Sequence, residues 1–171
     1  LTIGSGFATN LNVVLDSDAA VANTVTATNF TKNLTVTCSD LEVDATASTL
    51  TGGTGTDTLA ITTTAAKTLL LGSVTNFEKI TLTGDTNAAD ITTITTVDGL
   101  VASGKSLEID ATGLNGAGTD GVLSFNGAAE LDGSFVIKVE GTGTHSAILG
   151  NKNDTYTGTD GTGVQTVVAT A

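Results

Sequence analysis

The sequence predicts an all-β fold, a parallel β-solenoid or β-roll-like stack with Gly-Asp turns. Short segments alternate apolar and polar residues, as strands with one buried face do. Clusters of Gly, Asn, Asp and Thr recur between these segments and indicate turns. An antiparallel sandwich of the immunoglobulin type produces the same alternation and is the alternative. The Gly-x-Gly-x-Asp turns and the absence of proline favour the solenoid.

The strands follow from the alternation, because β-branched residues and Leu occupy one phase and mostly Thr the other. We expect strands at residues 34–38, 41–45, 79–83, 106–110, 122–125 and 135–139. Turns are expected at residues 51–56, 113–121, 141–143 and 150–163. Helix is compatible only with short stretches, such as residues 16–22 and 96–102.

Internal similarity suggests a repeated plan. Residues 28–32 (Thr-Asn-Phe-Thr-Lys) match residues 75–79 (Thr-Asn-Phe-Glu-Lys), and residues 41–46 match residues 107–112. Residues 41–46 and residues 107–112 are each followed by a Gly-rich turn with one Asp and then by an apolar strand. We therefore divide the chain into an N-terminal strand or edge segment (1–27), a repeated all-β core (28–140), and a C-terminal Gly/Asp turn region with a terminal strand (141–171).

Composition and charge narrow the classes of function. The 171 residues include 21 Gly, no Arg and no Pro, and six Lys stand against 18 acidic residues, for a net charge of -12. Nucleic acid and anionic membrane surfaces are therefore poor partners, and cations are favoured ones. A single Cys cannot form a disulfide within the chain, and no apolar stretch approaches the length of a membrane span. This composition indicates a structural protein more than a catalyst.

One motif carries chemistry. The segment Gly52-Gly-Thr-Gly-Thr-Asp57-Thr-Leu-Ala60 matches the nonapeptide of calcium-binding β-helix repeats in full. Glycines let the turn expose carbonyl oxygens, and Asp adds a carboxylate, which suits Ca²⁺ with its six to eight oxygen ligands. Near-matches occupy residues 116–120 and 150–156, the second continuing to Gly163.

At this point the chain resembles the RTX-type proteins exported by the type I pathway of Gram-negative bacteria, especially their Thr-, Ala- and Gly-rich surface-layer members. The resemblance rests on residues 52–60, on residues 74–83 (Val-Thr-Asn-Phe-Glu-Lys-Ile-Thr-Leu-Thr) and on residues 107–114 (Leu-Glu-Ile-Asp-Ala-Thr-Gly-Leu). It implies a secreted, extracellular protein at the bacterial cell surface, whose RTX repeats bind calcium and become ordered after export.

By position, the resemblance implies a set of calcium ligands. They are Gly53, Gly55, Asp57, Gly118, Asp120, Asn151, Asp154 and Asp160. The three turns are not in tandem, so each supplies half a coordination shell unless distant turns stack in space. The alternative is that these are tight turns in which Asp caps its own loop.

Catalytic constellations are not evident in the sequence, and we expect no enzymatic activity. His145 is the single histidine, and it lies in a Gly/Thr-rich loop where a solvated side chain is expected. There is no Gly-x-Ser-x-Gly elbow for a serine nucleophile.

Both ends of the chain are strand-like and carry neither Lys nor Pro, which usually protect sheet edges. The expected self-assembly edges are Val13, Val14, Val167 and Val168. The sequence thus predicts an extracellular structural protein that assembles with itself as a surface-layer or filament subunit, stabilised by calcium. The alternative is an adhesin or a module that binds glycan or ice, and a further expected partner is cell-surface polysaccharide.

Overall fold

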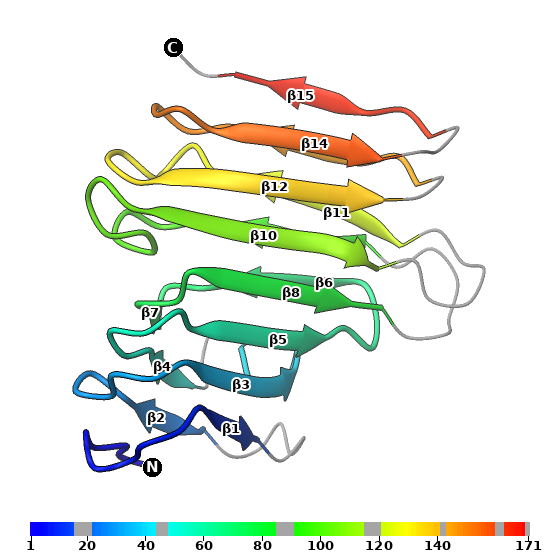
Figure 1. The fold of residues 1–171 in the computed structure, drawn as a ribbon. Coiled ribbons are helices and arrows are strands. Elements are labelled where there is room, and N and C mark those ends of the chain that lie inside the picture. Colours follow the sequence, from blue (N-terminus) through cyan, green and yellow to red (C-terminus); the bar gives the residue numbers. More distant parts are fainter. Residues whose placement is uncertain are drawn as a thin grey trace.

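The computed structural model describes residues 1–15, 22–43, 48–84, 91–114, 121–140, 143–159 and 163–169. The regular structure in these ranges is all strand, and the ribbon in Figure 1 rises from the N-terminus at one end of a stack to the C-terminus at the other. The strands are β1 (Leu11–Val14), β2 (Thr24–Thr26), β3 (Leu34–Ser39), β4 (Thr49–Thr51), β5 (Thr58–Thr62), β6 (Lys67–Leu70), β7 (Val74–Thr75), β8 (Lys79–Thr83), β9 (Ile91–Thr95), β10 (Ser106–Gly113), β11 (Val122–Asn126), β12 (Ser134–Glu140), β13 (Ser146–Ile148), β14 (Thr155–Thr159) and β15 (Thr166–Val168).

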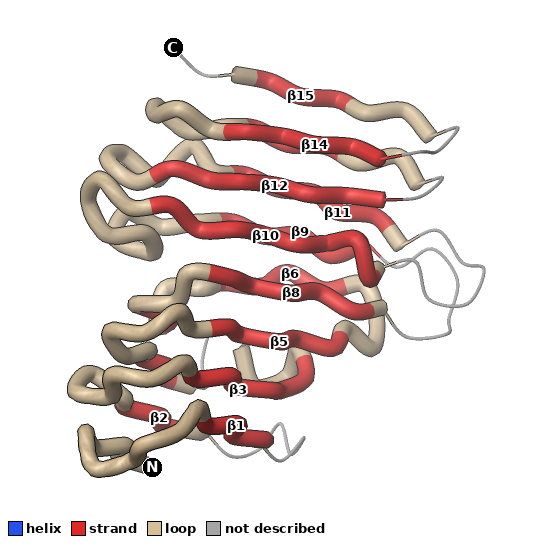
Figure 2. Tube along the Cα trace, in the orientation of Figure 1, coloured by secondary structure: helices blue, strands red, loops and turns tan. Residues whose placement is uncertain are grey.

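The strands form three sheets in which every pair is parallel. The seven-stranded sheet has the order β1-β3-β5-β8-β10-β12-β14, the five-stranded sheet β15-β13-β11-β9-β6, and the three-stranded sheet β2-β4-β7. Figure 2 shows the first of these as successive strand segments stacked along the front of the molecule. Parallel neighbours need a crossover connection, so the antiparallel sandwich is ruled out and the solenoid-like prediction is confirmed.

The chain supplies each crossover by visiting the other sheets. From β4 it passes to β5 and β6, then to β7, β8 and β9, so that each return adds one strand to a sheet. We call one full passage of the chain through the sheets a circuit. The sequence step between neighbouring strands of the seven-stranded sheet varies from 19 residues (Val136 to Thr155) to 30 residues (Thr83 to Gly113). This variation explains why the sequence shows only weak internal repeats.

The core lies between the sheets and consists of stacked aliphatic rows. Along the seven-stranded sheet, Val36, Leu59, Ile80, Ile109 and Ile137 lie opposite one another on successive strands, and all are buried. Full burial of each such side chain contributes about 1.5–3 kcal/mol. These rows, rather than disulfides or helices, hold neighbouring circuits together.

Several local predictions were wrong. Leu41 and Glu42 form a turn after β3 instead of a strand. The carboxylate of Glu42 accepts hydrogen bonds from the backbone N–H and the hydroxyl of Ser39, and the Glu42 N–H donates to the Ser39 carbonyl, which closes the turn. The similarity between residues 41–46 and 107–112 therefore does not mark equivalent structure, because the second segment lies in β10. Residues 44–47 lie outside the described residues.

The other repeat corresponds to structure in part. Phe30 and Phe77 are both buried in the connection that leads from the three-stranded sheet into the seven-stranded sheet. Residues 96–102 form turns and bends rather than a helix. The expected turn at residues 150–163 contains a strand, β14, because Thr155 and Tyr156 continue the parallel ladder beside β12.

Candidate functional site

Asp57 lies at the end of the glycine-rich turn before β5, and its side chain is fully buried. One carboxylate oxygen, Oδ1, accepts the backbone N–H of Leu34 on the preceding circuit at 2.8 Å. The other, Oδ2, accepts the backbone N–H of Gly53 within the turn. The Asp57 N–H itself donates to Oε2 of Glu78 on the next circuit at 2.7 Å. Asp57 therefore connects three consecutive circuits.

The two glycines of this turn are required by close packing. A Cβ at Gly53 would lie 2.3 Å from the carbonyl oxygen of Phe30, and one at Gly55 would lie 2.4 Å from that of Lys32. Both carbonyls belong to the preceding circuit, so the turns stack backbone against backbone. The glycines from which the sequence predicts calcium binding allow the close contact between stacked turns.

Asp154 repeats the arrangement on the last circuit. Its Oδ1 accepts the N–H of Phe135 and its Oδ2 accepts the N–H of Gly150, both at 2.7 Å. Asp57 and Gly53 have the same four-residue spacing as Asp154 and Gly150. In the turns of Asp57 and Asp154, both carboxylate oxygens accept hydrogen bonds from backbone N–H groups. This is the alternative in which the Asp caps its loop rather than supplying half of a calcium site.

The structure does not bring together those predicted calcium ligands that it describes. Gly53, Gly55 and Asp57 precede β5, whereas Asn151 and Asp154 precede β14, four strands away in the seven-stranded sheet. Gly118, Asp120 and Asp160 lie outside the described residues.

A different group of acidic side chains lies close enough together that it could hold a cation. Carboxylate oxygens of Asp98, Glu130 and Asp132 all lie within 4.8 Å of one another. Glu130 is fully buried and accepts the N–H groups of Val101 and Gly133, each at 3.1 Å. Carboxylates have about four acceptor positions, so these oxygens keep capacity for a hard cation such as Ca²⁺.

Sequence reasoning missed this group because its members come from two circuits. Asp98 and Asp132 lie in turns 34 positions apart, which the irregular length of the circuits conceals. A usable signal exists, since both residues are followed by glycine, at Gly99 and Gly133.

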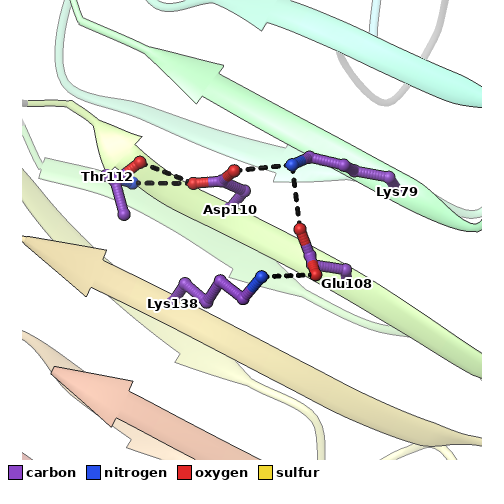
Figure 3. Close-up of polar contacts among 5 residues, drawn as sticks. All are labelled: Lys79, Glu108, Asp110, Thr112 and Lys138. Atoms are coloured by element: carbon purple, nitrogen blue, oxygen red, sulfur yellow. Dashed lines mark hydrogen bonds and ion pairs between the residues drawn. The ribbon is translucent and has the colours of Figure 1, made fainter.

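A charged network lies on the outer face of the seven-stranded sheet (Figure 3). Lys79 of β8 contacts Glu108 and Asp110 of β10 at 2.8 and 2.7 Å, and Lys138 of β12 contacts Glu108 at 2.7 Å. Asp110 also accepts the hydroxyl of Thr112. Hydrogen bonds from Lys138 and Lys79 lower the pKa of Glu108. The network joins three strands and is partly exposed.

His145 is not solvated, contrary to the sequence-based expectation, but fully buried. His145 lies directly before β13, at a position whose side chain faces the core. Its Nδ1 accepts the backbone N–H of Leu123 on the preceding circuit at 2.9 Å. Burial lowers the pKa of the ring. His145 thus has the capping role that Asp57 and Asp154 have elsewhere.

The predicted assembly edges lie on the outermost strands. Val13 and Val14 belong to β1, the first strand of the seven-stranded sheet, and Val167 and Val168 belong to β15, an edge of the five-stranded sheet. Val14 is 71% exposed, Val167 43% and Val168 49%, whereas Val13 is partly buried against the core.

Comparison of the chain with models of protein families, with curated proteins and with solved structures gave no match. The described part of the chain has no helix of the length and apolar character that a membrane crossing requires.

Proposed function

We propose that this chain is a structural module that assembles with copies of itself at a bacterial cell surface, as a subunit of a surface layer or filament. One observation carries the proposal: the core is incompletely covered at both ends of the stack. Among the residues that the structure describes, the apolar side chains that pack against the core while only partly buried are Leu11, Val13, Leu15 and Tyr156. All four lie on the first or last circuit.

Among the described strands, β1 pairs with β3 alone, so one side of its backbone has no strand partner in the described part of the chain. Leu11 and Leu15 donate their N–H groups to Asn33 and Thr37 on the neighbouring circuit. Since backbone polar groups alternate between the two sides of a strand, those of Asn12 and Val14 point away from the sheet. They form an edge that a further parallel strand can extend.

The last circuit has a corresponding edge. Thr166 donates its N–H to the His145 carbonyl, and the Val168 carbonyl accepts the N–H of Leu149. The backbone groups of Val167 between them therefore face away from the five-stranded sheet. In the seven-stranded sheet, β14 pairs on one side with β12 and is the last strand of the described order.

The two ends are complementary in direction. All strands of the seven-stranded sheet run parallel, so β1 of one copy placed beside β14 of another continues the same ladder. None of the strands β1, β14 and β15 contains a charged residue, the usual protection of an exposed edge. Contacts between opposite ends do not close on themselves and generate filaments or layers.

Calcium is part of this proposal. Eighteen acidic residues against six Lys destabilise a compact ion-free chain by repulsion, and cation binding offsets that repulsion. The group formed by Asp98, Glu130 and Asp132 supports a Ca²⁺ site at the turns between circuits. The buried His145, whose Nδ1 is occupied by the N–H of Leu123, supports a structural rather than a catalytic role.

Assembly is tested by analytical ultracentrifugation and electron microscopy over a range of protein concentrations with Ca²⁺. We expect ordered polymers of the native chain, and folded monomers of Val14→Lys and Val167→Lys. Ile91→Lys is the matched control, because Ile91 is 48% exposed but lies on β9, an inner strand of the five-stranded sheet, and it should assemble normally. A native chain that stays monomeric at high concentration with Ca²⁺ would refute the assembly role.

Calcium is tested separately by thermal melts with Ca²⁺ or chelator. We expect Ca²⁺ to raise the melting temperature, and Asp132→Asn to remove most of that increase. Asp154→Asn should lower stability but keep the calcium shift, since its carboxylate caps N–H groups. If Ca²⁺ leaves the native melting temperature unchanged, the calcium role is wrong.

A further inference from the structure

The flank of the stack changes character where the three-stranded sheet ends. Its last strand is β7, and later circuits pass this flank as turns that lead into β10, β12 and β14. Two hollows of about 280 and 230 Å³ lie along these turns.

The first hollow has an apolar base and a polar rim. Its buried lining comes from Phe77, Leu100 and Val101. Around them, the exposed residues include Thr54, Asn76, Glu78, Lys105 and Ser106. One oxygen of Glu78 accepts the N–H of Asp57, which holds that side chain in place at the rim.

The second hollow adjoins the first. Lys105 lines both, and Ser106 of the first hollow is the direct cross-strand partner of Ser134, which lines the second. The second hollow also contains Asp132, Asn151, Lys152 and Asn153. Neighbouring strands lie about 4.8 Å apart, so one extended ligand can reach both hollows.

The lining balances charge and contains both hydrogen-bond donors and acceptors. Glu78 and Asp132 offset Lys105 and Lys152, and hydroxyl and amide side chains fill the remaining rim. Within the described ranges, neither Lys105 nor Lys152 forms an ion pair, so their ammonium groups are available as donors. Ligands bind such concave sites through an apolar base and a few placed polar groups.

We propose that the two hollows form one groove that binds an uncharged oligosaccharide. Vicinal hydroxyl groups both donate and accept hydrogen bonds, which matches a rim of ammonium, amide, hydroxyl and carboxylate groups. Without Ca²⁺ at Asp132 the groove's charges cancel, and the net charge of -12 on the chain disfavours an acidic glycan. The groove runs along the flank across successive circuits, as a linear polymer requires.

Isothermal titration calorimetry tests the proposal on the Val14→Lys variant, so that saccharide binding is measured apart from assembly. The probes are neutral hexasaccharides of glucose, galactose and mannose, and hexagalacturonate as the acidic counterpart. We expect at least one neutral probe to bind, more tightly than hexagalacturonate. Lys105→Ala should weaken that binding about tenfold, because it removes a charged donor common to both hollows.

Two filling variants provide the second measurement. Ser106→Tyr and Ser134→Tyr occupy the first and second hollow, and each should weaken binding while circular dichroism shows a folded chain. Lys32→Ala and Thr62→Tyr are the controls, because both residues are exposed and line neither hollow. The proposal is overturned if no neutral probe binds, if hexagalacturonate binds more tightly, or if the Lys105 and Tyr variants bind like the controls.

Discussion

The buried carboxylate of Asp57 accepts the backbone N–H of Leu34, which lies 23 positions earlier in the chain and directly before it in the stack. The same side chain also accepts the N–H of Gly53. A parallel sheet leaves a backbone donor unsatisfied wherever a turn departs from the ladder, and burial makes such a donor costly. Asp57, Asp154 and His145 each satisfy one of these donors on the preceding circuit.

We predict that Asp57→Ala lowers the free energy of unfolding by about 2–5 kcal/mol, because two N–H groups lose a charged acceptor. Asp57→Asn retains one acceptor oxygen and should cost less. Urea denaturation of the monomeric Val14→Lys background, with and without Ca²⁺, measures both. Equal losses in the presence and absence of Ca²⁺ are expected; a loss seen only with Ca²⁺ would instead identify Asp57 as a calcium ligand.

His145 should make the free energy of unfolding depend on pH. Burial holds the pKa of the folded ring below its usual value of 6.5, so the neutral ring is favoured in the folded state. Its contribution is complete above pH 6.5 and is lost as the pH falls toward the folded pKa, with a slope of at most about 1.4 kcal/mol per pH unit.

The His145→Asn variant isolates this dependence, since the Asn oxygen replaces Nδ1 as acceptor for Leu123 without titrating. We expect the native chain to lose more stability than the variant between pH 7.5 and 5 in urea denaturation. Parallel pH profiles of the two proteins would show that His145 does not couple folding to protons.

The charged network on the outer face should contribute modestly to the free energy of unfolding. Glu108→Gln removes both ion pairs of that residue and is expected to lower stability by about 0.5–1 kcal/mol at pH 7 and low salt, because the side chains are partly exposed. Lys138 and then Lys79 lower the pKa of Glu108 from 4.5, so the contribution is present above that pH and is lost as the pH falls through the lowered pKa.

Urea denaturation at low and high salt measures the contribution of the Glu108 ion pairs. The difference in the free energy of unfolding between the native chain and Glu108→Gln should shrink in 1 M NaCl. Thr62→Val, on the same outer face, is a control without a charge. A salt-independent effect of Glu108→Gln would indicate that packing rather than charge stabilises this face.

Cys38 should be inert while the chain is folded. Burial, followed by the nearby charges of Glu42 and Asp40, raises the pKa of its thiol to about 12, so the reactive thiolate is almost absent at neutral pH. Labelling with a thiol reagent should proceed at the rate of unfolding, and urea should accelerate it. Rapid labelling of the native chain would show that the end of β3 opens locally.

Much of the fold could be predicted from the alternation of apolar and polar residues. Strand β8 covers the predicted residues 79–83, and β10, β11 and β12 include the predicted strands with extensions of one to three residues. Alternation is a local property, because each inward position must be apolar to join the stacked rows. The prediction failed at Leu41 and Glu42, where the same alternation belongs to a turn closed by a side chain.

The sequence by itself determined the all-β class, most of the long strands and the glycine-rich turns, since these follow from residue type and short-range spacing. Only the tertiary structure decided which turns stack and what their carboxylates bind. Circuits of unequal length bring Asp98 beside Glu130 and Asp132, place Leu34 over Asp57, and bury His145 against Leu123. Contacts between circuits depend on register across 19 to 34 positions, and no local pattern encodes that register.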